Sequence, residues 1–269
     1  MFPNPHADLT LNSNLNSPII TLSIGNAARL FAAHESILDA SPFFSAITRG
    51  QFFESHSKRI SLPEEIPEVF SSVLEYLYKG DYYPKLLHNK RKDTWQLEDA
   101  PPASTAAAPS AASTVYHDGA GQDLLKDTLV YCAADRYGLG ELKRLALRKQ
   151  GLQSGISCNT ILQSARYAYA NTAESDSKLR AHYLALIIRS RSIFKRSGTM
   201  QIEMEKGNGG GLWFDLFVAM CNHMHLKEPE DAKDALMPPQ PWNPVWKPAS
   251  MITPYHPSIQ IGLATHCYV

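Results

Sequence analysis

The sequence predicts an α+β fold in which a small three-stranded sheet packs with a cluster of α-helices and is followed by additional helices. Three short segments in the N-terminal part alternate apolar and polar residues with a period of two, which is typical of strands with one buried face. Longer segments repeat apolar residues every three or four positions, which is typical of helices that bury one stripe. A small sheet with helices gathered on its faces defines the α+β class.

The composition is that of a folded chain with balanced charge. Hydrophobic residues make up 44% of the 269 residues, which is enough to build a sizeable core. Lys and Arg together number 26, as do Asp and Glu, so the formal net charge is zero. A protein that coats nucleic acid needs surplus cations, and this balance argues against one. No apolar run approaches the roughly 18 residues of a membrane helix, and we expect no secretory signal in the polar N-terminus.

The cysteines do not follow a disulfide or zinc pattern, because their spacings are wide and none belongs to a C-x-x-C pair. We therefore expect buried thiols in a reducing compartment, and a cytoplasmic or nuclear protein. The four cysteines are Cys132, Cys158, Cys221 and Cys267.

A two-stranded hairpin opens the predicted fold. Residues 18–24 alternate apolar and polar side chains, which predicts a strand with one buried face. Gly25 and Asn26 give a turn signal, and a second strand is predicted through 30–32. The buried face of the first strand is predicted to carry Ile20, Leu22 and Ile24.

A short helix and a third strand follow the hairpin. Ser41 and Pro42 mark a helix start, because Ser caps the first turn and Pro fits where its missing N–H would be unpaired. Ile60 and Leu62 alternate with polar neighbours, which predicts a strand that ends at Pro63.

The clearest helical pattern in the chain lies between residues 66 and 77. Its apolar residues fall on one stripe of a 3.6-residue period. Lys79 and Gly80 end this helix with a cationic last turn and a glycine cap. The stripe consists of Ile66, Val69, Phe70, Val73, Leu74 and Leu77.

The composition changes sharply after this helix. Residues 100–114 contain only Ala, Pro, Ser and Thr, which cannot offset the entropy of ordering the chain. We therefore predict a disordered insertion over residues 88–121, and a disordered polar tail over residues 1–17.

Helices are predicted to resume at Asp123 and to continue into a C-terminal helical extension over residues 151–226. Residues 227–269 form a Pro-rich tail that will not form regular helices. Within the extension, helices are predicted at 157–170, 176–196 and 212–226.

Five stretches of the chain, in the right order and spacing, resemble motifs of the BTB/POZ domain. They are FAAHE at 31–35, LDASPFF at 38–44, FFES at 52–55 with ISL at 60–62, FSSVLEYLYKG at 70–80, and YCAADRYGL at 131–139. The resemblance covers residues 18–150, which are assigned to the BTB/POZ domain. The insertion and the helical extension are similar to the fungal branch of the family.

Two features depart from the family pattern. Ala33 and Glu35 stand where Val and Lys are common, and Glu35 reverses one charge of the pocket that binds corepressors in dimeric transcription-factor members. The N-terminal helix and strand that such dimers exchange have no clear counterpart in residues 1–17.

The resemblance implies a protein–protein interaction module and not an enzyme. Phe52 and Glu54 match the hydrophobic-x-Glu motif through which BTB adaptors of cullin-RING ubiquitin ligases engage the cullin. An exposed apolar anchor with a neighbouring carboxylate suits that contact. In the alternative interpretation, Phe52 packs into its own domain and Glu54 is solvated.

The function expected from the resemblance is that of a substrate adaptor for a cullin-RING ligase. The alternative function is a homo-oligomerising BTB scaffold in transcriptional regulation without its own DNA-binding domain. Expected partners are proteins, namely a cullin, a second copy in a homodimer, or both, with no direct nucleic-acid contact and no membrane contact.

Tyr82 and Tyr83 follow the glycine cap and are predicted partner contacts, with core packing as the alternative. His34 is predicted to be a hydrogen-bonded structural residue and not a catalytic base. The predicted structural core comprises Phe31, His34, Leu38, Phe44, Phe70, Leu74 and Leu77.

No motif supports catalysis, phosphate binding or a cofactor. The C-x-H-x-H sequence of Cys221, His223 and His225 does not predict a metal site, because His223 points about 200° away from Cys221 on a helix. The basic clusters at 89–92 and 189–196 are interpreted as solvated charge runs, with nuclear import as the alternative for the first.

Overall fold

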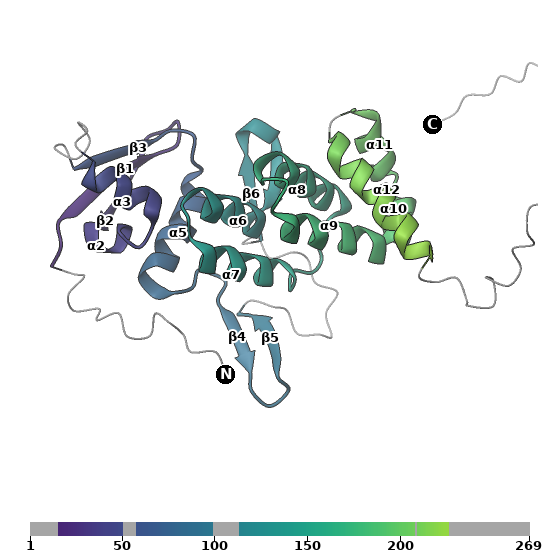
Figure 1. The fold of residues 1–269 in the computed structure, drawn as a ribbon, viewed down its shortest axis with the longest axis horizontal. Coiled ribbons are helices and arrows are strands. Elements are labelled where there is room, and N and C mark those ends of the chain that lie inside the picture. The colour runs from purple at the N-terminus through teal and green to yellow at the C-terminus, as the bar shows by residue number, and fades with distance from the viewer. Residues whose placement is uncertain (1–15, 51–57, 99–112, 208, 226–269) are drawn as a thin grey trace, which may run out of the picture. The chain divides into compact units, whose positions relative to one another are not determined.

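The computed structural model describes residues 16–50, 58–98, 113–207 and 209–225 (Figure 1). The described residues up to Met224 belong to one compact unit, and the description below concerns that unit. Small sheets and many helices give the α+β class that the sequence predicts, with extra helices after the first domain.

A three-stranded sheet forms the N-terminal part of the fold. Strands β1 (Ile19–Ile24) and β2 (Arg29–His34) pair antiparallel, and β3 (Arg59–Leu62) lies parallel to β1 on its other side. Gly25 adopts a φ of +73° in the turn, a conformation that glycine reaches without strain. The inner face of β1 buries the predicted residues Ile20, Leu22 and Ile24.

Three helices share a core with the inner face of this sheet: α2 (Glu35–Leu38), α3 (Pro42–Arg49) and α5 (Pro67–Lys79). The Ser41 hydroxyl caps α3 by accepting a hydrogen bond from the Phe44 amide at 3.4 Å. The same hydroxyl donates to the Tyr137 carbonyl at 2.7 Å and so connects α3 to a distant part of the chain. Gly80 ends α5 in the left-handed region.

The core of the domain is aromatic and extends into the following helices α6 (Lys126–Arg136) and α7 (Gly140–Gln150). The Phe44 ring lies 4.8 Å from the Tyr137 ring and 6.1 Å from the Phe70 ring, between centroids. Residues 126–134 of α6 are buried without exception. The sheet, α5 and α6 therefore share one core.

The prediction of disorder over residues 88–121 is wrong for both of its ends. Strands β4 (Leu86–Asn89) and β5 (Thr94–Leu97) form one antiparallel hairpin. Strands β6 (Thr114–His117) and β7 (Gln122–Leu125), joined by the 3-10 turn η2 (Asp118–Ala120), form another. Short segments that mix apolar and polar residues, on either side of the Ala/Pro/Ser/Thr segment, supply these strands. Within that segment, residues 100–112 lie outside the described ranges.

The chain continues as helices α8 (Cys158–Asn171), α9 (Ser177–Arg189), α10 (Arg191–Ser197), α11 (Thr199–Glu205) and α12 (Gly210–His225). The predicted helix at 176–196 is interrupted at Ser190, and the predicted start of helix at Asp123 is wrong because that residue belongs to β7. None of the helices in the described ranges is long and apolar enough to cross a membrane.

Candidate protein-interaction surfaces

The four predicted partner residues have different positions in the structure. Phe52 and Glu54 lie outside the described residues, in the connection between α3 and β3. Tyr83 is 44% exposed. Tyr82 is fully buried, so the prediction that it contacts a partner is wrong.

Tyr82 is buried because its ring and its hydroxyl both have partners inside the chain. The hydroxyl donates to an Asp127 carboxylate oxygen at 2.7 Å, and the Lys149 ammonium lies 3.7 Å from the centre of the ring. Burial raises the pKa of Tyr82 well above its ordinary value, and the Asp127 carboxylate raises it further. Such an arrangement suits a structural residue and not a surface anchor.

Lys149 lies at the centre of the contacts around Tyr82, and its burial was not predicted from the sequence. Its side chain is fully buried, pairs with Asp81 and donates hydrogen bonds to the carbonyls of Tyr82 and Pro84. Burial lowers the pKa of Lys149, and the neighbouring Asp81 partly opposes that shift. We name Asp81, Tyr82, Asp127 and Lys149 the Lys149 cluster.

The sequence contains a weak signal for the Lys149 cluster. Leu142 and Ala146 are buried on α7, and Lys149 follows at the next position of the same stripe. A lysine on an apolar stripe indicates a buried charge, but the sequence does not show which carboxylate and carbonyls would surround it.

The predicted core residues lie in or against the core of the domain. Leu38, Phe44, Phe70 and Leu74 are buried, whereas Phe31, His34 and Leu77 are partly buried. His34 Nδ1 lies 2.8 Å from the Tyr78 hydroxyl, which also accepts from the His34 amide at 3.0 Å. This hydrogen bonding ties the end of β2 to α5.

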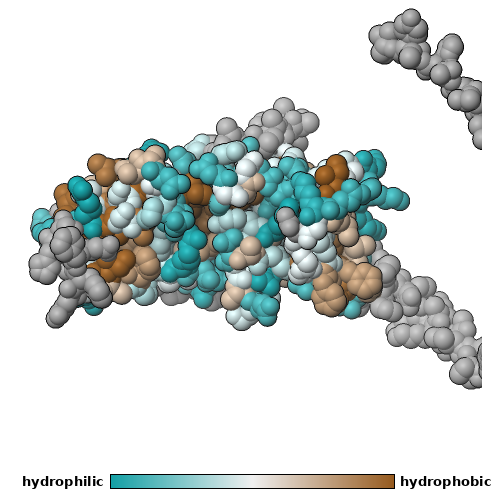
Figure 2. Space-filling view, turned by 90° about the horizontal axis from the view of Figure 1, so that it is seen from above, coloured by the Kyte–Doolittle hydropathy of each residue, from teal (hydrophilic) through white to brown (hydrophobic). Residues whose placement is uncertain are grey.

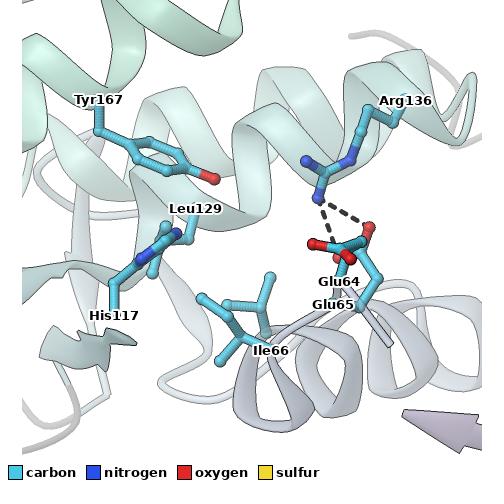
Figure 3. A pocket seen from close by; sticks show the side chains of 8 residues that line it. Glu64, Glu65, Ile66, His117, Leu129, Arg136 and Tyr167 are labelled. Carbon is cyan, nitrogen blue, oxygen red and sulfur yellow. Dashed lines mark hydrogen bonds and ion pairs between the residues drawn. The ribbon is translucent and has the colours of Figure 1, made fainter. Parts of the chain in front are cut away.

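A recess lies where four segments of the chain meet (Figure 3). Its volume is about 20 Å³, room for roughly one water molecule. Arg136 Nη2 lies 2.9 Å from both carboxylate oxygens of Glu65 at this recess. Small-molecule sites need about 300 Å³ or more, so we interpret this recess as a junction between elements. It is lined by Glu64, Glu65, Ile66, Val69, His117, Leu129, Arg136 and Tyr167.

Exposed apolar side chains gather on two surfaces. On the outer face of the three-stranded sheet, Ile19 is 58% and Leu30 is 65% exposed. On α12, Phe214 is 68% and Phe217 is 67% exposed. Figure 2 shows hydrophobic residues at the end of the molecule that carries the sheet and again over the C-terminal helices. Exposed apolar side chains of this kind are candidates for contacts with other macromolecules.

Metal-ligating side chains do not converge in the described part of the chain, where no group of three or more His, Cys, Asp or Glu residues could hold an ion. The backbone of Cys221, His223 and His225 lies on α12, as expected for a helical segment.

Comparison with known proteins identifies the N-terminal domain. The family model of the BTB/POZ domain matches residues 19–96, from β1 into β5. A search of curated proteins found no match. BTB/POZ domains are protein–protein interaction modules, and the exposed apolar side chains on the sheet and on α12 suit such a role. The chain therefore contains a BTB/POZ domain over residues 19–96, a domain that implies protein–protein interaction.

Proposed function

We propose that this protein is a substrate adaptor of a cullin-RING ubiquitin ligase and that Phe52 and Glu54 contact the cullin. The observation that carries the proposal is the hydrophobic-x-Glu sequence in the connection between α3 and β3 of a BTB/POZ domain. A buried aromatic anchor beside an orienting charge is a common centre of a protein interface.

The described ends of that connection support the proposal. Arg49 at the end of α3 and Lys58 and Arg59 at the start of β3 are exposed. β3 is also an edge strand of its sheet, since β1 is its one partner among the described strands. A connection that leaves and re-enters the fold at the surface is suited to presenting side chains to a partner.

The test is a cullin pull-down with the wild type, Phe52→Ala and Glu54→Ala, alongside thermal melts. Phe52→Ala should weaken cullin binding by about 2 kcal/mol, a roughly 30-fold loss, with little change in melting temperature. Tyr116→Ala, which truncates a 58% exposed aromatic residue in β6, is the matched control and should bind normally. Failure of the wild type to retain a cullin, or equal retention by the double variant Phe52→Ala/Glu54→Ala, would refute the adaptor proposal.

A homo-oligomerising scaffold is the second candidate, and the outer face of the sheet favours it. Ile19 and Leu30 project from the face opposite to the buried residues of β1 and β2, as the strand register requires. We expect a dimer across this face if the scaffold function is correct. Light scattering should then report a dimer for the wild type and a monomer for Ile19→Asp/Leu30→Asp; a monomeric wild type would contradict the scaffold.

A further inference from the structure

We propose that the β4–β5 hairpin, residues 86–97, binds an acidic, extended segment of a partner protein. We name this hairpin the basic arm. It lies away from the α3–β3 connection in the chain, so the proposal is independent of the cullin contact. Figure 1 shows the basic arm extending from the helices with its turn at the far end.

The turn of the basic arm carries three consecutive cations, Lys90, Arg91 and Lys92, all of them exposed. None of the three forms an ion pair with a described carboxylate. The acid nearest in sequence, Asp93, is bound instead to His88 Nε2 at 2.9 Å. The positive charge at the turn is therefore available to a partner.

Local hydrogen bonds fix the backbone that carries these cations. The side-chain oxygen of Asn89 accepts from the amides of Arg91 at 3.1 Å and Lys92 at 3.4 Å. Asp93 then adopts a φ of +48°, which completes the turn. This geometry distinguishes the basic arm from an ordinary solvated charge run, because the three residues start from one ordered tight turn.

The base of the basic arm is fixed by the Lys149 cluster. Lys149 donates to the carbonyls of Tyr82 and Pro84, just before β4 begins. The Leu86 amide, at the first residue of β4, donates to Asp81 at 3.0 Å. A binding element that is already ordered loses less conformational entropy when its partner arrives.

One face of the basic arm packs on α7. The Trp95 ring stacks on the His88 ring with centroids 4.3 Å apart, and the Arg148 guanidinium lies 5.1 Å from the centre of the Trp95 ring. Leu97, on the same face, is 7% exposed. The opposite face carries Leu87, which is 41% exposed.

The edges of the basic arm suit an extended peptide. In the described structure β4 and β5 pair with each other and with no third strand. An unpaired edge offers backbone N–H and C=O groups to an added strand. Carboxylates on that strand would complement the three cations, and an apolar side chain would contact Leu87.

A protein segment fits this surface better than a nucleic acid does. Three cations are few for a phosphate backbone, and the chain as a whole has a formal net charge of zero. The Trp95 ring, which could otherwise stack on a base, already contacts His88 and Arg148. The neighbouring BTB/POZ domain is itself a module that binds proteins.

The test measures binding of a fluorescent peptide that alternates Glu and Val, by anisotropy, to the full chain. Lys90→Glu/Arg91→Glu/Lys92→Glu should raise the Kd at least about tenfold relative to the wild type. The matched control, Arg191→Glu/Lys195→Glu/Arg196→Glu, makes the same charge change at exposed residues of α10 and should leave the Kd within about twofold. Circular dichroism melts verify that both variants are folded.

Two further probes test the class of partner. The same peptide methylated at alternate backbone nitrogens should bind at least about tenfold more weakly, because it cannot add as a strand. A single-stranded DNA of equal charge should bind more weakly than the peptide. The proposal is overturned if the wild type does not bind the peptide, if both triple variants weaken it equally, if N-methylation has no effect, or if the DNA binds more tightly.

Discussion

At the scale of single residues, Lys149 shows how a charge can be held inside the fold. Its ammonium group is fully buried, but an ion pair, two carbonyls and an aromatic ring surround it. Removing one partner from such a group is costly because the remaining polar atoms stay buried without their hydrogen bonds. Lys149 also joins α7 to the segment that leads into β4.

We predict that Lys149→Ala lowers the free energy of unfolding by about 3–5 kcal/mol, measured by chemical denaturation. The loss arises because Asp81 and the carbonyls of Tyr82 and Pro84 lose their shared donor. Arg144→Ala is the control: its side chain is 71% exposed, and it should change stability by about 0.5 kcal/mol or less. A near-neutral Lys149→Ala would mean that the cluster does not stabilise the fold.

At the scale of elements, a helix or hairpin could be predicted when the contacts that stabilise it lie within one short stretch of the sequence. The helix α5 was predictable because its stripe and its Gly80 cap lie within one short stretch. The hairpin β4–β5 was missed because its strands are short and lack a clear alternation, and because its anchors, Arg148 and Lys149, lie far along the chain. For the same reason Tyr82 was expected at the surface, because its partners Asp127 and Lys149 lie far from it in the sequence.

The stripe on α5 gives a prediction at this scale. Leu74 is 8% exposed and packs in the core, so Leu74→Ala should cost about 2–5 kcal/mol of unfolding free energy. Ser71→Ala, on the exposed side of the same helix, should be close to neutral. Urea titrations of both variants make the comparison. Equal stability of the two variants would mean that the predicted apolar stripe of α5 does not face the core.

At the scale of the whole molecule, contacts cross the boundary that we predicted at residue 150. The Leu125 amide donates to the Ser164 hydroxyl at 2.9 Å, and the Tyr131 hydroxyl donates to Asp176 at 2.9 Å. Buried side chains of α8 and α9 belong to the same core as those of α6. The helical extension therefore stabilises the domain that precedes it.

We predict that a chain truncated after Gln150 loses cooperative unfolding, because the partners of α6 on α8 and α9 are absent. A chain truncated after His225 keeps every described element and serves as the control. Soluble yield and circular dichroism melts compare the two. A cooperative melt of the shorter chain at the wild-type temperature would show that the domain folds alone.

The hydrogen bond between Ser41 and Tyr137 has a consequence for how this protein is made. These residues are separated by 96 positions, and the aromatic cluster around Phe44 needs both of their segments. Ribosomes add about 5–20 residues per second, so roughly 5–20 s separate the synthesis of the two segments. Throughout that interval Phe44 and Phe70 lack the ring that covers them. We therefore expect the nascent chain to expose this apolar surface to chaperones until Tyr137 has left the exit tunnel.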